Sequence, residues 1–98
     1  MSRDEVLRKL RAHEAELKAA GIVRLAVFGS VARGDSSADS DVDLLADFDK
    51  TKRYTLLTMG RLENHLAELL GTSVDLSSPA WLSESVSKRV LEEAVVAF

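Results

Sequence analysis

The stretch GSVARGDSSADSDVDL, residues 29–44, decides the fold of this 98-residue chain. It follows the run IVRLAVF, residues 22–28, which is apolar apart from Arg24 and predicts a buried strand. Gly29 permits a close backbone approach, and Ser30 would open a single helical turn whose N–H groups and hydroxyl face outward. The stretch therefore predicts an anion site, with phosphate as the expected anion, at the end of a strand.

A second strand is predicted from Asp41 onward because side chains alternate there between two faces. One face would carry Val42, Leu44, Ala46 and Phe48, and the other Asp41, Asp43, Leu45 and Asp47. Asp41 and Asp43 would then lie side by side, about 7 Å apart at the backbone. Only 11 residues, 30–40, separate Gly29 from Asp41, fewer than a parallel crossover needs, so we expect antiparallel neighbours. Ser30 and the two aspartates would face one pocket, where they could hold a triphosphate and its hard, Mg²⁺-like cations.

Two other phosphate- or metal-binding motifs do not match the residues of this segment. A P-loop needs lysine after its second glycine, but Asp35 follows Gly34. An EF-hand that began at Asp39 would need glycine at its sixth position and glutamate at its twelfth, where Leu44 and Lys50 stand. Both alternatives are therefore set aside.

Asp75 is the candidate for a third acid. The segment 72–77 lies between Gly71 and Pro79 and alternates, which predicts a short strand with Asp75 on its polar face. Such an acid could complete metal coordination and take the proton of an attacking hydroxyl, although it could also be an ordinary solvated aspartate. Three neighbouring carboxylates repel one another, so at least one should have a raised pKa.

These residues resemble the motif of the minimal nucleotidyltransferases of the DNA polymerase beta superfamily. The short form of that motif is matched by Gly29, Ser30, Asp41 and Asp43. The longer form adds Arg33, Gly34, Ser40 and Leu44, and Asp75 stands in the place of the third acid. The resemblance covers nearly the whole chain and implies an α/β (α+β) nucleotidyltransferase fold. Its sheet would be small and mixed, with three or slightly more strands packed against helices.

The resemblance also implies residue roles. Asp41, Asp43 and Asp75 would be catalytic and would bind two Mg²⁺ ions. Nucleotide binding would fall to Gly29, Ser30, Arg33 and Ser40. From the residues alone, Arg33 could equally pair with Asp35 or another motif carboxylate, and Ser40 could simply turn the chain into its strand.

The family transfers a nucleoside monophosphate from a nucleoside triphosphate, and the implied reaction here moves AMP from ATP onto a hydroxyl of a partner protein. Many minimal members resemble antitoxins that are paired with a helical HEPN-domain toxin. Two other functions stay open. One is a non-catalytic antitoxin that binds nucleotide and neutralises its partner by occlusion, and the other is a small-molecule transferase of the aminoglycoside type.

Length, composition and charge predict the domain organisation of the protein, its compartment and the classes of partner it can have. The length predicts a single domain, residues 1–98, with no room for a second substrate domain, so the acceptor is expected to come from a partner. Cysteine is absent, which leaves oxygen ligands for metals and fits a cytoplasmic protein. A net charge of −3 argues against nucleic-acid binding, and no run of 18 apolar residues predicts a membrane span.

Three helices are predicted around these strands. The first spans 3–20, with Ser2 and Glu5 as a capping box, and the second spans 54–70 and ends at Gly71. The residues expected inward on the second helix are Leu57, Leu62, Leu66, Leu69 and Leu70. The third follows Pro79, with Val86, Val90, Leu91, Ala94 and Val95 at helical spacing. Trp81 and Phe98 are expected in the core or at a partner surface, and His13 and His65 at the surface or its boundary.

Overall fold

The computed structural model describes residues 2–35 and 41–98. Ser40, a predicted nucleotide-binding residue, lies outside the described residues. In chain order the elements are α1 (Arg3–Ala12), α2 (Glu14–Ala19), β1 (Ile22–Phe28), α3 (Gly29–Arg33), β2 (Val42–Phe48), α4 (Leu56–Leu70), β3 (Val74–Ser77), the 3₁₀ turn η1 (Pro79–Trp81), α5 (Glu84–Glu93) and β4 (Val95–Val96).

The four strands form one mixed sheet in the order β3-β2-β1-β4. β1 and β2 are antiparallel, as the short connection predicts, and β2 and β3 are parallel. The mixed sheet of the nucleotidyltransferase fold is thus confirmed, and its four strands agree with the expected three or slightly more.

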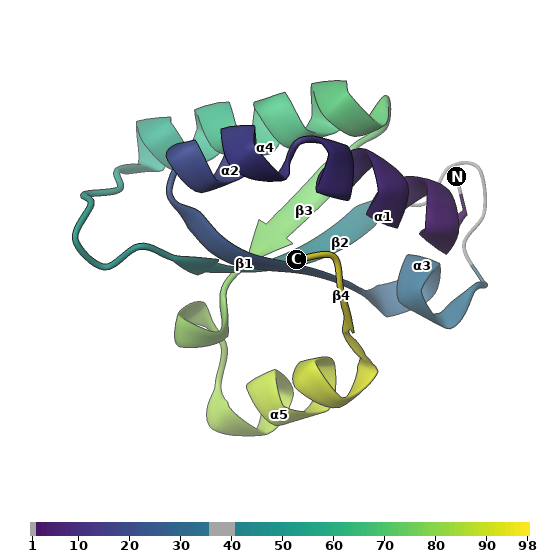
Figure 1. Cartoon of the computed structure of the whole chain (residues 1–98). Helices are drawn as coiled ribbons and strands as arrows, with labels where there is room; N and C mark the ends of the chain where they lie inside the picture. The colour runs from purple at the N-terminus through teal and green to yellow at the C-terminus, as the bar shows by residue number, and fades with distance from the viewer. Residues whose placement is uncertain (1, 36–40) are drawn as a thin grey trace.

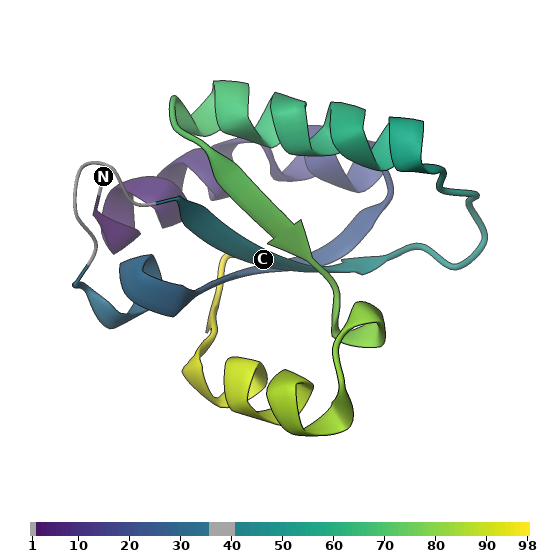
Figure 2. The same cartoon turned by 180° about the vertical axis from the view of Figure 1, so that it is seen from behind.

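Helices cover the two faces of the sheet unequally. α1, α2 and α4 lie together on one face, and α5 lies on the other (Figures 1 and 2). The core forms under the three helices, where Leu10, Leu17, Leu66 and Leu70 are fully buried. α5, by contrast, has no buried residue. The chain is therefore built mainly from one helical layer on a sheet.

The first helix is shorter than predicted, because the expected single helix over 3–20 breaks at His13. His13 Nδ1 lies 2.9 Å from the Lys9 carbonyl oxygen, which would accept the His13 N–H in a continuous helix. The His13 N–H donates instead to the Leu10 carbonyl at 3.1 Å. Ser2 caps α1 as expected, since its hydroxyl oxygen accepts the Glu5 N–H at 3.2 Å. His13 and His65 are both half-buried, at the boundary where they were expected.

α4 begins two residues later than predicted, because Thr55 is its N-cap and accepts the Thr58 N–H. Leu62, Leu66 and Leu70 point into the core, as expected, and Leu69 is partly buried against it. The prediction for Leu57 was wrong, since this side chain is 64% exposed. Five residues before Leu62, it lies about 140° around the helix from the buried stripe.

The C-terminal prediction was partly wrong as well. α5 ends at Glu93, Ala94 is extended, and Val95–Val96 form β4 on the free edge of β1. Ala94 and Val95 therefore do not continue the predicted helix. Two adjacent apolar residues such as Val95–Val96 are compatible with both helical and strand spacing, so the sequence does not decide between them. Pairing with the neighbouring β1 makes them a strand. No helix in the described part of the chain is long and apolar enough to cross a membrane.

Candidate functional site

Three neighbouring strands bring the predicted acids to one end of the sheet. Asp43, at the start of β2, pairs with Phe28 at the end of β1 on one side and with Asp75 of β3 on the other. Because β1 is antiparallel to β2, the residues after Phe28 turn over the start of β2. Asp41 lies one residue before that strand and is exposed. The sheet thus brings Gly29, which directly follows β1, to the same end as Asp43 and Asp75 on the next two strands.

Gly29 is required where the turn meets Asp43. Its φ is +73°, a conformation that side chains rarely adopt. A Cβ built on Gly29 would overlap the Asp43 Oδ2 atom. The backbone of the predicted phosphate turn is therefore packed directly against the Asp43 carboxylate, and Ser30 follows in the first turn of α3.

Asp43 differs from the other two acids in its burial. It is half-buried, whereas Asp41 and Asp75 are exposed. Burial raises the pKa of Asp43, and the negative charges of Asp75 and Asp41 raise it further, while Arg33 lowers it. The raised pKa agrees with the expectation that the acid cluster is electrostatically crowded.

The donor chemistry of this site suits a hard cation. Its side chains are carboxylates, the oxygen ligands that Mg²⁺ prefers, and each of the two neighbours acts electrostatically on Asp43. Within residues 2–35 and 41–98, no three His, Cys, Asp or Glu side chains are gathered closely enough to hold a metal ion. The residue types thus fit a hard cation, whereas the described side chains do not form a set of three ligands, so metal binding by Asp41, Asp43 and Asp75 stays a prediction.

Arg33 is paired with carboxylates on both sides. Its Nη1 lies 2.7 Å from Glu93 Oε1, and its Nε lies 3.4 Å from Asp35 Oδ2. These interactions raise the pKa of Arg33, with the Asp35 hydrogen bond as the leading cause. Of the two roles open to Arg33 from sequence, the structure shows the pairing with carboxylates.

Glu93 belongs to this site and was missed by sequence reasoning. Its Oε1 accepts the Gly29 N–H at 2.9 Å in addition to its contact with Arg33. Glu93 ends α5, and 64 positions separate it from Gly29. In the sequence it is one of two adjacent glutamates on a helix with an exposed face, so no local signal distinguishes it.

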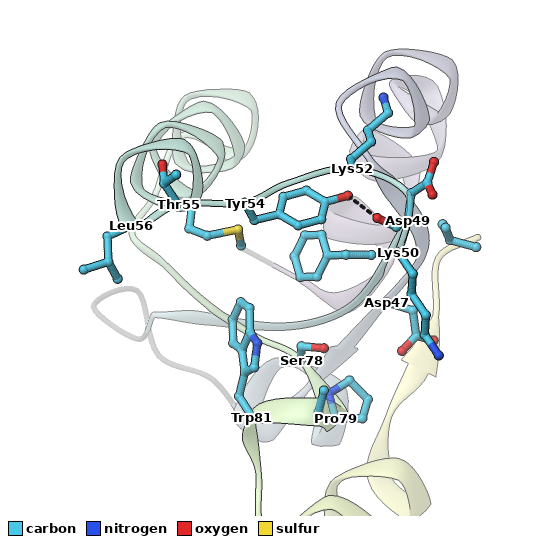
Figure 3. Close-up of a pocket in the computed structure, with 14 residues that line it drawn as sticks. Asp47, Asp49, Lys50, Lys52, Tyr54, Thr55, Leu56, Ser78, Pro79 and Trp81 are labelled. Atoms are coloured by element: carbon cyan, nitrogen blue, oxygen red, sulfur yellow. Dashed lines mark hydrogen bonds between the residues drawn. The ribbon is translucent and has the colours of Figure 1, made fainter.

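A separate pocket of about 990 Å³ lies at the opposite end of β1 and β2 (Figure 3). Phe48, at the end of β2, contributes to it, and Trp81 stacks on Phe48 with ring centroids 5.6 Å apart. Tyr54 closes one side, and its hydroxyl donates to the Asp49 carbonyl at 2.9 Å (Figure 3). Phe48 lies five positions after Asp43 on β2, which is about 16 Å along the strand. The pocket is therefore distinct from the acid cluster.

Trp81 and Phe98 differ in burial. Trp81 is 54% exposed at the pocket, and Phe98 is partly buried against the core. Trp81 thus takes the surface position, and Phe98 the core position, of the two that the sequence left open.

Comparison with known proteins agrees with this geometry. The sequence model of the nucleotidyltransferase domain matches residues 7–97. The chain belongs to this nucleotidyltransferase family. The protein adenylyltransferase MntA of Thermococcus cleftensis is 41% identical over 93 residues, covering 94% of this chain and 92% of that protein. The resemblance inferred from the motif is therefore confirmed, and the chain is a nucleotidyltransferase.

Solved structures share the fold of this nucleotidyltransferase. A minimal nucleotidyltransferase has a TM-score of 0.78 and 43% identity, covering 97% of this chain and 95% of that one. A chain from the complex of tri-AMPylated Shewanella oneidensis HEPN toxin with MNT antitoxin has a TM-score of 0.66. Its identity is 16%, and the match covers 94% of this chain and 71% of that one, so it shows the fold alone.

Proposed function

We propose that this nucleotidyltransferase transfers AMP from ATP to a hydroxyl group of a partner protein. The observation that carries the proposal is the packing of the Gly29 turn on Asp43, with Asp75 on the adjacent strand. A phosphate turn and acidic residues at one end of a sheet are what positioning and charge neutralisation of a triphosphate require. The name of the relative that is 41% identical, protein adenylyltransferase, supports the choice of acceptor class.

Each residue has a role in this reaction. Ser30 and its turn would bind the triphosphate, and Asp41, Asp43 and Asp75 would hold two Mg²⁺ ions. When bound, these ions would neutralise phosphate charge. Asp75 would also take the proton of the acceptor hydroxyl, whose oxygen forms the new bond to the α-phosphorus while the bond to the β-phosphate oxygen breaks and pyrophosphate leaves.

Asp75 is placed where a large acceptor can reach it. It is exposed, and β3 is an edge strand of the sheet. An acceptor hydroxyl carried by another protein can therefore approach from the open side of β3. We propose that this acceptor is a HEPN-type toxin, for which the chain is the antitoxin. The fold shared with a chain from the MNT–HEPN complex supports this pairing.

The test is transfer of label from α-labelled ATP, with Mg²⁺, to the protein encoded beside this chain. We expect label on that protein and release of pyrophosphate, and loss of both with Asp43→Asn. Asp47→Asn is the matched control, because Asp47 is exposed at the far end of the same strand. Absence of transfer by the unaltered chain would contradict the proposal, and label on an added aminoglycoside would favour the small-molecule alternative.

A second candidate function is neutralisation of the partner by occlusion. The observation that favours it is the exposed apolar surface away from the acids, where Leu56 is 95% exposed and Trp81 54%. The double variant Asp41→Asn with Asp43→Asn separates the two functions. If it still neutralises the partner fully, binding is the mechanism, and if neutralisation is lost while the complex still forms, transfer is.

A further inference from the structure

Glu93 is held beside the phosphate turn by the backbone of the sheet. β4 begins two residues after Glu93, and its Val95 pairs with Val27 near the end of β1. Because of that pairing, the C-terminal end of α5 lies next to the end of β1, where Gly29 follows. The carboxylate of Glu93 then accepts the Gly29 N–H at 2.9 Å and the Arg33 Nη1–H at 2.7 Å.

These two contacts join both ends of α3. Gly29 is the first residue of α3 and Arg33 the last, so one carboxylate oxygen clamps the whole turn that carries Ser30. Hydrogen bonds between charged groups are about twice as strong as neutral ones, and the Gly29 N–H is one of the helix-start donors that lack an intrahelical acceptor. The clamp also engages the Gly29 amide and Arg33, two groups to which the sequence assigned phosphate.

We propose that Glu93 is a positioning residue for the nucleotidyl transfer: it fixes the Gly29–Arg33 turn against Asp43 so that Ser30 is presented to the triphosphate. This inference rests on the proposed function. Misplacement of a binding group by about 1 Å can cost as much as 100-fold in rate, so the clamp has a kinetic consequence even though Glu93 need not touch the nucleotide.

The experiment compares Glu93→Ala and Glu93→Gln with the control Glu92→Ala. Glu92 is the exposed neighbour, and its replacement changes the net charge equally. We expect Glu93→Ala to lower kcat for AMP transfer about 10- to 100-fold. Glu93→Gln should keep most of the kcat of the unaltered chain, because the glutamine amide oxygen still accepts both N–H groups. Glu92→Ala should match the unaltered chain.

An NMR readout on the full chain makes the contact testable without catalysis. The Gly29 amide proton should shift upfield and exchange faster in Glu93→Ala, and change little in Glu92→Ala. If the unaltered chain transfers no AMP, the proposed function fails, and the positioning role is then judged on this amide and on affinity for ATP.

Three results would overturn the inference. The first is a Glu93→Ala variant with the kcat of Glu92→Ala. The second is a Glu93→Gln variant as impaired as Glu93→Ala. That result would show that acceptance of the two N–H groups is not what sustains the transfer rate. The third is tighter ATP binding by Glu93→Ala, which would make Glu93 a competitor of the phosphates.

Discussion

Asp43 is poorly stabilised as an anion, since burial and the carboxylates of Asp75, Asp41 and Glu93 all oppose its charge. Such crowding at the point where a glycine turn meets the acid is more easily explained by ligand binding than by stability. At the scale of single residues, the site is therefore expected to exchange stability for function.

Replacing Asp43 with asparagine should stabilise the protein and abolish AMP transfer. The expected gain at neutral pH is a few tenths to about 1 kcal/mol, because solvent screens a half-buried group. The pKa of Asp43 is raised in the folded state, so the protonated acid favours folding. Its contribution is therefore complete below the unfolded pKa of about 3.9 and is lost as pH rises through the folded value. Urea unfolding of the unaltered chain and of Asp43→Asn, at acidic and neutral pH, measures the difference between their free energies of unfolding. A difference that does not shrink in acid would contradict this prediction.

Gly29→Ala should destabilise the chain more than Gly34→Ala. Both glycines have positive φ, at +73° and +80°, so both substitutions are strained, by about 1–2 kcal/mol. Only at Gly29 does a new Cβ meet a neighbour, Asp43, while nothing lies within 4 Å at Gly34. Thermal unfolding of the pair checks this, and equal losses would show that the Gly29 turn does not press on Asp43.

At the scale of elements, the pattern of apolar residues predicted β1, β2 and α4, which are long enough for several residues to fit the same pattern. α4 buries a stripe at helical spacing, whereas β1 and β2 each have three consecutive buried residues, because the middle of the sheet is covered on both faces. Two features did not follow from the apolar pattern. The break at His13 depends on one side-chain contact to a carbonyl, and β4 exists only because β1 offers it an edge.

The two faces of α4 can be compared by leucine truncation. Leu66→Ala should cost about 2–5 kcal/mol, because Leu66 is fully buried in the core. Leu57→Ala should change stability by less than about 0.5 kcal/mol, since its side chain is 64% exposed. Denaturant midpoints measured in parallel test the orientation of the helix, and a large loss at Leu57 would mean that its first turn is packed.

At the scale of the whole molecule, the acid cluster and the aromatic pocket occupy opposite ends of the same two strands. The nucleotide site that we propose at the acid cluster is therefore separate from the aromatic pocket.

Trp81 is the only tryptophan and lies at the pocket, so its fluorescence reports on that end alone. We expect ATP with Mg²⁺ to leave its emission nearly unchanged, after correction for absorbance with free tryptophan as the reference. Strong quenching by ATP would instead locate the nucleotide against the indole ring and contradict the assignment to the acid cluster.

The sequence by itself determined the family and the candidate acids through the motif, and the resemblance implied the mixed sheet, while strand alternation and a short connection predicted the antiparallel pairing of β1 and β2. Only the tertiary structure decided that Glu93 joins the turn and that Trp81 stays exposed. The physical reason is that local spacing encodes which side of an element is buried. Contacts between segments 64 positions apart arise only when the sheet brings their backbones together.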